Sequence, residues 1–341
     1  MKKEKSAKRR LTMGAVLAAG LLSLLSGCGS RTDSRRIVRI GHNQSVNHPT
    51  HLALTAFQEM IGERLGDRFR VEVYPSELLG SQTDMVQLTQ TGAMDFCVAS
   101  NAILETFSKD YELFNLPYLF QSTEAYHGAM EDEEVTGPVF SATRQAGFTA
   151  VAWLDAGTRN FYTVERPEDL RGLKIRVQQS PTNIEMMRLL GGSATPMGFG
   201  DVYTALQSGI IDGAENNEMA LTDNGHGDVC RYYSYDMHQM VPDLLIGNYG
   251  FLESLTKEER AVFEEGFEEL ERVQQEEWGK AVEAAREKAE KEQKVTFLYP
   301  DREPFAAAVL PLHEMVLERN PALRPLYERI RKYNEMYASG Q

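Results

Sequence analysis

Strand-like and helix-like patterns of hydrophobic residues alternate from residue 37 onward. Strand patterns occupy residues 37–40, 71–74 and 95–99, and helical spacing occupies residues 52–65 and 83–91. This alternation predicts an α/β fold with a mainly parallel sheet and helices on both of its faces. Ligands on such sheets bind beyond the carboxyl ends of the strands. Those ends carry His42, Asn43 and Gln44 after the first strand and Ser100 after the third.

The same patterns return in the middle of the chain and then give way to one long helix. Residues 150–154, 174–177 and 210–214 are typical of strands, and residues 184–190 and 201–208 are typical of helices. Thr256 and Glu259 have the spacing of a capping box. The helix that they open is densely charged, has a narrow hydrophobic stripe and continues to about residue 291. Such a helix can lie across two lobes rather than inside either one.

The N-terminal segment has the features of a lipoprotein signal peptide. Six basic residues and one acidic residue precede an uncharged stretch from Leu11 to Leu25, which is too short for a membrane-spanning helix. The following Ser26-Gly27-Cys28 resembles the lipobox of bacterial lipoproteins. This resemblance implies cleavage after residue 27 and a lipid on Cys28. The polar composition that follows predicts a lipidated tether over residues 28–36. We therefore expect an extracytoplasmic protein anchored to the cell membrane by its lipid.

Composition limits the partners of the mature chain. Removal of the signal segment shifts the formal net charge from −14 to about −19, so the body has no attraction for nucleic acid or anionic lipid surfaces. Any anion that it binds requires local positive charge in a cleft. Two cysteines remain, Cys97 and Cys230, and the sequence leaves open whether they form a disulfide.

The sequence contains no signature of an enzyme. A nucleophile elbow, a phosphate loop, a dinucleotide fingerprint and paired-cysteine zinc spacing are all lacking. His48 and His51 are close in sequence, but capping or packing is the simpler role for them. We therefore expect neither a cofactor nor a metal. Arg159 and Arg176 are candidates for binding a carboxylate through paired hydrogen bonds, although on spacing alone a surface salt bridge is the better-supported role for each.

Three central blocks resemble the solute-binding subunit of TRAP transporters, the DctP-type family. The blocks are residues 169–177 (DLRGLKIRV), 195–209 (TPMGFGDVYTALQSG) and 212–216 (DGAEN), and residues 74–80 and 115–120 add weaker matches. The resemblance implies a two-lobed, periplasmic-binding-protein-like α/β fold, with a mixed sheet flanked by helices in each lobe. It places lobe I at residues 37–153 and about 242–255, lobe II at residues 154–241, and a long inter-lobe helix with C-terminal helices at residues 256–341.

The resemblance also implies roles for individual residues. Arg176 matches the arginine that pairs with the ligand carboxylate, and Arg159 matches a second cationic contact. Phe199 matches an aromatic that packs on the ligand, while Asn216 and Asn43 match polar contacts from the two lobes. Ser100 stands where sialic-acid binders of the family have a glutamate, which argues against that ligand.

Residues 153–162 with 214–217 resemble the sugar-acid branch of the family, whose ligands are hexuronates and aldonates. The proposed partners for ligand hydroxyls are Asn43, Gln44, Ser100, Asp155, Gln178 and Glu215, and His238 completes the candidate ligand-binding set. A C4-dicarboxylate remains an alternative ligand, because His42 offers a second cationic group that would bind the other carboxylate. The implied partner is a TRAP membrane permease, with presentation of the ligand to a sensor as a further alternative.

Overall fold

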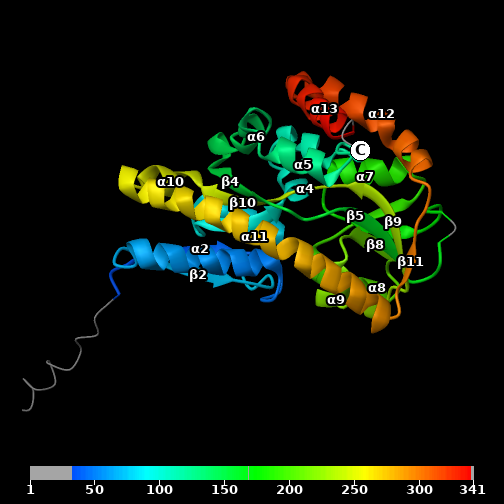
Figure 1. Ribbon diagram of the computed structural model, residues 1–341, viewed down its shortest axis with the longest axis horizontal. Coiled ribbons are helices and arrows are strands. Elements are labelled where there is room, and N and C mark those ends of the chain that lie inside the picture. Colours follow the sequence, from blue (N-terminus) through cyan, green and yellow to red (C-terminus); the bar gives the residue numbers. More distant parts are fainter. Residues whose placement is uncertain (1–32, 168, 339–341) are drawn as a thin grey trace, which may run out of the picture. The chain divides into compact units, whose positions relative to one another are not determined.

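The computed structural model describes residues 33–167 and 169–338 (Figure 1). The chain divides into two units, Met1–Arg36 and Ile37–Gln341, and only the second is described further. The expected signal segment and the lipidation site Cys28 lie outside the described residues. Among the helices of the described residues, none combines the length and hydrophobicity that a membrane crossing requires.

The first sheet has five strands in the order β2-β1-β3-β10-β4. These strands are β1 (Arg36–Gly41), β2 (Phe69–Tyr74), β3 (Phe96–Ser100), β4 (Phe148–Leu154) and β10 (Asp243–Asn248). β1 and β3 are parallel, whereas β10 runs antiparallel to both β3 and β4. Alternate residues of β3 enter different cores, since Cys97 and Ala99 pack on one face and Phe96 and Val98 on the other.

The second sheet has six strands in the order β11-β9-β5-β8-β6-β7. They are β5 (Arg159–Thr163), β6 (Lys174–Val177), β7 (Ser193–Pro196), β8 (Gly213–Asn216), β9 (Tyr232–Gln239) and β11 (Thr296–Leu298). β6 is parallel to β7 and β8, and β5 is antiparallel to β8 and β9. Both sheets are therefore mixed, as the predicted fold class states, because β10 and β5 each run antiparallel to both of their neighbours. The expectation of a mainly parallel sheet did not foresee these two strands. β11 lies in a segment for which only helices were expected.

Helices cover both sheets. In chain order they are α2 (Pro49–Leu65), α3 (Gln82–Thr91), α4 (Asn101–Leu104), α5 (Thr123–Met130), α6 (Glu133–Phe140), α7 (Pro181–Leu189), α8 (Val202–Gln207), α9 (Met219–Asp223), α10 (Tyr249–Ser254), α11 (Lys257–Lys291), α12 (Glu303–Arg319) and α13 (Arg324–Ala338). On the five-stranded sheet, α2 and the start of α11 bury one face and α3 packs on the other.

The long helix α11 serves both sheets, as predicted. Its capping box is present, because Glu259 N donates to Thr256 Oγ1 at 3.2 Å and Thr256 N donates to Glu259 Oε2 at 2.7 Å. Phe263 and Phe267 join the core of the five-stranded sheet, while Ala289 joins the core of the six-stranded sheet. Figure 1 shows α11, yellow to orange, passing along both. The two-lobed α/β fold class with a long spanning helix is confirmed.

The α11 helix also holds the point where the chain passes from β4 to β5. Asp155 N donates to Gln274 Oε1 at 3.0 Å, and Gln274 Nε2 donates back to Asp155 O at 2.7 Å. Trp153 N donates to Glu271 Oε1 at 2.8 Å. Side chains from one turn of α11 thus satisfy backbone groups at the end of β4 and just after it that would otherwise need hydrogen bonds from a neighbouring strand.

The two cysteines of the described residues do not form a disulfide. Cys97 and Cys230 are both free and buried. Burial raises the pKa of each thiol to about 12, so both behave as small hydrophobic side chains.

Candidate functional site

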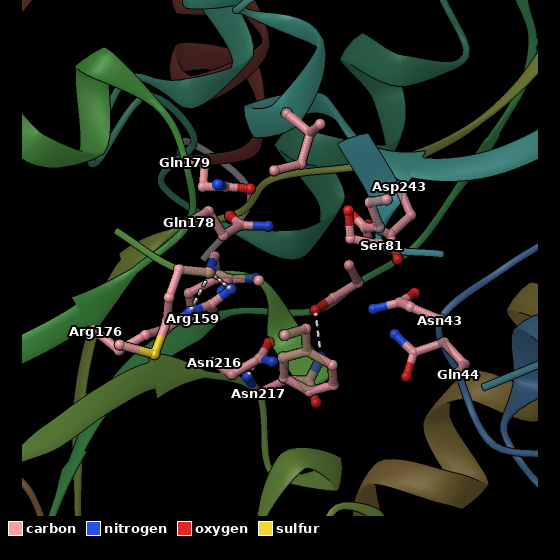
Figure 2. A pocket seen from close by; sticks show the side chains of 16 residues that line it. Asn43, Gln44, Ser81, Arg159, Arg176, Gln178, Gln179, Asn216, Asn217 and Asp243 are labelled. Carbon is pink, nitrogen blue, oxygen red and sulfur yellow. Dashed lines mark hydrogen bonds between the residues drawn. The ribbon is translucent and has the colours of Figure 1, made fainter. Parts of the chain in front are cut away.

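A polar cavity lies where the edges of the two sheets face each other (Figure 2). Its lining residues are Asn43, Gln44, Ser81, Gln82, Ile103, Ala156, Arg159, Arg176, Gln178, Gln179, Met197, Gly198, Phe199, Asn216, Asn217 and Asp243. In Figure 2, Arg159, Arg176, Gln178 and Gln179 stand on one side, and Asn43, Gln44, Ser81 and Asp243 stand on the other. The cavity therefore has a cationic side, which carries Arg159 and Arg176 of the six-stranded sheet, and an opposite side on which the labelled residues are two amides, a serine and an aspartate.

Arg176 in β6 is fixed in place but not neutralised. Ile175 and Val177 on either side of it are core residues. The Arg176 guanidinium donates to Met197 O from Nε at 3.2 Å and from Nη2 at 2.9 Å, and its Cζ lies 5.7 Å from the centre of the Phe199 ring. Of the five N–H donors of an arginine, three then remain for a ligand.

The charge of Arg176 has no salt-bridge partner among the described residues. Its side chain is only 3 % exposed. Burial lowers its pKa, and the nearby negative charge of Glu215 partly offsets that effect. An arginine nevertheless stays protonated in proteins. A buried cation of this kind is stabilised when an anion enters the cavity.

Arg159 in β5, by contrast, is paired within the protein. Its Nε donates to Glu215 Oε2 at 2.5 Å and its Nη2 donates to Glu215 O at 3.0 Å. Burial works against the charged form of Glu215, but Arg159 and His238 outweigh it and lower the pKa of Glu215 to about 2. Arg159 therefore adds hydrogen-bond donors to the cavity, while most of its charge is compensated.

His238 and Asp236 extend this pair behind the cavity wall. His238 Nδ1 lies 2.6 Å from Asp236 Oδ2, and His238 Nε2 lies 3.7 Å from Glu215 Oε2. Burial opposes the charged form of His238, but Asp236 and Glu215 raise its pKa to about 9. The four side chains form a buried row of alternating charge that fixes the Arg159 guanidinium.

Amides supply most of the remaining lining. Asn217 Nδ2 donates to Ala156 O at 3.0 Å, and Asn217 N donates to Asn216 Oδ1 at 2.9 Å, so this corner is held by its own hydrogen bonds. Asn43 Oδ1 and Gln178 Oε1 are buried acceptors without a partner among the described residues. Buried acceptors usually have partners, and a hydroxylated ligand would provide them here.

Glu77 makes a contact from one side of the cleft to the other. It lies between β2 and α3, and its carboxylate closely approaches the backbone of Gly200, which follows Phe199. Burial and the nearby Asp201 raise the pKa of Glu77. A side chain at position 200 would collide with this carboxylate, so the glycine permits the close approach.

Residues 40–320 match the family described as bacterial extracellular solute-binding protein, family 7. The chain belongs to this family. A protein of Salmonella typhimurium strain LT2, the uncharacterized YiiZ, is 40% identical over 313 residues, which are 91% of this chain and 95% of the relative.

Solved structures of the family are closely similar. A TRAP periplasmic solute-binding protein of Anaerococcus prevotii with bound D-glucuronate is 64% identical, with a TM-score of 0.88 over 89% of this chain and 99% of that one. Another from Xanthobacter autotrophicus with bound β-D-galacturonate is 30% identical, with a TM-score of 0.83 over 86% and 99% of the two chains. Family 7 proteins lie outside the cytoplasm, where they bind substrates that are to be transported, and they are not enzymes.

Seven of the residues expected to bind ligand in this family 7 chain line the cavity. They are Asn43, Gln44, Arg159, Arg176, Gln178, Phe199 and Asn216. Five do not line it. Glu215 and His238 stand behind Arg159, and Ser100 donates its backbone N–H to Gln82 Oε1 at 3.1 Å. Asp155 lies at the strand crossing, where its Oδ2 is 2.8 Å from His127 Nε2.

The fifth residue, His42, differs most from its expected role. Gln44 N donates to His42 Nδ1 at 3.2 Å, so the His42 Nε2–H must donate to His51 Nδ1, 3.0 Å away. Burial, with the nearby His51 and His48, lowers the pKa of His42 to about 3. His42 is therefore neutral at physiological pH and cannot act as a second cationic grip.

The sequence patterns did not reveal five further polar lining residues: Ser81, Gln82, Gln179, Asn217 and Asp243. Ser81 had a local signal, because it begins the capping box of α3 with Asp84, but that signal concerns the helix rather than the cavity. Asp243 had none, since its role depends on where β10 lies in the five-stranded sheet.

Proposed function

We propose that this chain binds a sugar acid, a hexuronate in the first place, and delivers it to a TRAP-type membrane permease. The observation that carries the proposal is the buried guanidinium of Arg176, which has no salt-bridge partner among residues 33–167 and 169–338. A ligand carboxylate would take two parallel hydrogen bonds from it and compensate its charge. Met197 and Phe199 hold the guanidinium in one orientation, which lowers the entropy cost of binding.

The rest of the cavity favours a ligand with many hydroxyl groups. Amide side chains of Asn43, Gln44, Gln178, Gln179 and Asn216 line it, and each can both donate and accept hydrogen bonds. Sugar hydroxyls have the same dual character. Phe199 would offer its ring to the apolar C–H face of a sugar while it stacks on Arg176.

The relatives support the same ligand class. The Anaerococcus prevotii protein holds D-glucuronate at 64% identity to this chain, and the Xanthobacter autotrophicus protein holds β-D-galacturonate. A C4-dicarboxylate would need a second cation, and His42 does not provide one because its pKa is lowered to about 3. A sugar acid is therefore the better supported of the two alternatives.

Capture follows from the two-sided arrangement of the cavity. Lobe I, residues 37–153 with about 242–255, would contribute Asn43, Gln44 and Ser81, and lobe II, residues 154–241, would contribute the arginines. A ligand that contacts both lobes stabilises the closed form over the open one, and Glu77 would add a direct contact when the lobes meet. In the proposed role, the closed form docks on the permease, and a lipid on Cys28 keeps it at the membrane.

A ligand screen tests the proposal. The mature chain would be melted with hexuronates, aldonates, C4-dicarboxylates and keto acids, since a ligand at one hundred times its Kd stabilises the folded state by about 2.7 kcal/mol. D-Glucuronate or D-galacturonate should raise the melting temperature and bind stoichiometrically by calorimetry. A stabilising C4-dicarboxylate with no response to any sugar acid would refute the proposed ligand class.

A further inference from the structure

Asp243 is the one carboxylate among the sixteen described residues that line the cavity. It begins β10, and its backbone lies between Ser100 of β3 and Leu154 of β4. Because strands flank it on both sides, its position is fixed by the sheet rather than by a loop. Figure 2 shows Asp243 beside Ser81, on the side of the cavity away from Arg176.

The Asp243 carboxylate has no hydrogen-bond donor among the residues that the structure describes. It is 8 % exposed, and this exposure is toward the cavity that it lines. Burial raises its pKa to about 6, against the opposing effect of the positive charge of Arg159. Asp243 is therefore mostly ionised above neutral pH. An ionised carboxylate only accepts hydrogen bonds, so a ligand must present donors to it.

We propose that Asp243 determines ligand specificity by accepting hydrogen bonds from sugar hydroxyls and excluding a second carboxylate. The inference rests on the proposed function, in which Arg176 holds the carboxylate of the ligand. The amides of Asn43, Gln44 and Gln82, which line the same cavity, have N–H groups that can donate hydrogen bonds to an anion. Asp243 cannot, and two like charges repel more strongly in a partly desolvated cavity than in water.

The resulting ligand class is a polyhydroxylated monocarboxylate, such as a hexuronate or an aldonate. Aldarates, which carry a carboxylate at each end, are rejected although they match hexuronates in length and in hydroxyl groups. C4-dicarboxylates are rejected for the same reason. Specificity thus comes from a repulsive group on one lobe as well as from an attractive group on the other.

The experiment is a comparison of D-glucuronate and D-glucarate on wild-type protein and Asp243→Asn. Calorimetric Kd values at pH 7.5, by competition where binding is weak, give the ratio of the two affinities for each protein. Glucuronate is cyclic and glucarate is open, but this difference cancels when the ratio for one protein is divided by that for the other. We expect the ratio to shift toward glucarate by about tenfold or more in Asp243→Asn.

Two further variants complete the test. Asp67→Asn removes one exposed charge outside the cavity lining and should leave the ratio unchanged, which controls for net charge. Asp243→Ser removes the carboxylate with a smaller side chain, and it replaces Asp243→Asn if that variant does not fold. An unchanged ratio in the neutral variants that fold, with glucuronate still bound by the wild type, would overturn this inference alone. No uronate binding by the wild type would overturn the proposed function as well.

Discussion

Replacing Arg176 with methionine should separate ligand binding from folding. The methionine fills much of the same space but carries no charge and donates no hydrogen bond. Loss of one partner from a desolvated charge pair costs about 2–5 kcal/mol. At about 1.4 kcal/mol per decade, Arg176→Met should weaken sugar-acid binding by roughly 30-fold to several thousand-fold.

Although Arg176→Met weakens ligand binding, it should increase the folding stability of the ligand-free protein or change it very little. Burying one ion costs several kcal/mol, whereas hydrogen bonds from a charged group, like those of Arg176 to Met197 O, contribute about 1.5–3 kcal/mol. Methionine removes both contributions. We therefore expect the free energy of unfolding of the empty variant to equal or exceed that of the wild type.

Calorimetry and denaturant unfolding, measured on the same preparations, check this pair of expectations. Arg188→Met is the matched control, because Arg188 pairs with Glu185 on the surface of α7 and its side chain is 65 % exposed. That variant should bind like the wild type. Near-wild-type affinity in Arg176→Met would refute the role given to Arg176, and a large loss of stability would refute the argument about its unpaired charge.

Three further predictions concern the groups around the cavity. The pKa of Glu215 is lowered to about 2, so its stabilising effect is present above pH 4.5 and is lost as the pH falls toward 2. Glu215→Gln should therefore reduce the change in the free energy of unfolding, measured with urea, between pH 4.5 and 2. An unchanged loss of stability over this range would contradict the pairing with Arg159. The pKa of His238 is raised to about 9, so its contribution to folding stability is complete below pH 6.5 and disappears as the pH rises through 9. In His238→Gln this alkaline loss of stability should be absent from melting curves. If the loss persists in the variant, another group causes it. Glu77→Ala removes the close polar contact between this carboxylate and the Gly200 backbone. If that contact is worth about 0.5–1.5 kcal/mol, ligand release should become about two- to tenfold faster in stopped-flow measurements, and an unaltered rate would show that the contact does not hold the cavity closed.

Local signals predicted five helices, α2, α3, α7, α8 and α11, close to their observed positions. The capping box at Thr256 and the charge pattern after it gave α11 its observed bounds, Lys257–Lys291, because both signals lie within the helix itself. The prediction of a mainly parallel sheet missed the reversed strands β5 and β10, because strand direction depends on where the chain passes between sheets. β10 is hydrophobic like a parallel core strand, yet it runs antiparallel to both neighbours, and no pattern within residues 243–248 records that.

The site was predictable only in part for a related reason. Family motifs identified Arg159 and Arg176, but their spacing could not distinguish the two. The structure distinguishes them through Glu215, which lies 56 residues from Arg159 in the sequence and forms a salt bridge with Arg159 but not with Arg176. His42 was misinterpreted because its neutral state depends on burial and on His51, and Asp243 was missed because the sheet brings it to the cavity.

The unpaired charge of Arg176 also has an evolutionary consequence. Selection for folding alone would tolerate or favour uncharged residues at position 176, since the empty protein gains no net stability from burying a cation there. Selection for growth on the ligand would retain arginine and reject even lysine, which lacks the paired donors. A library of all substitutions at this position, sorted once for folding and once for uptake, should therefore give opposite rankings, whereas a core position such as Phe57 should give the same ranking in both.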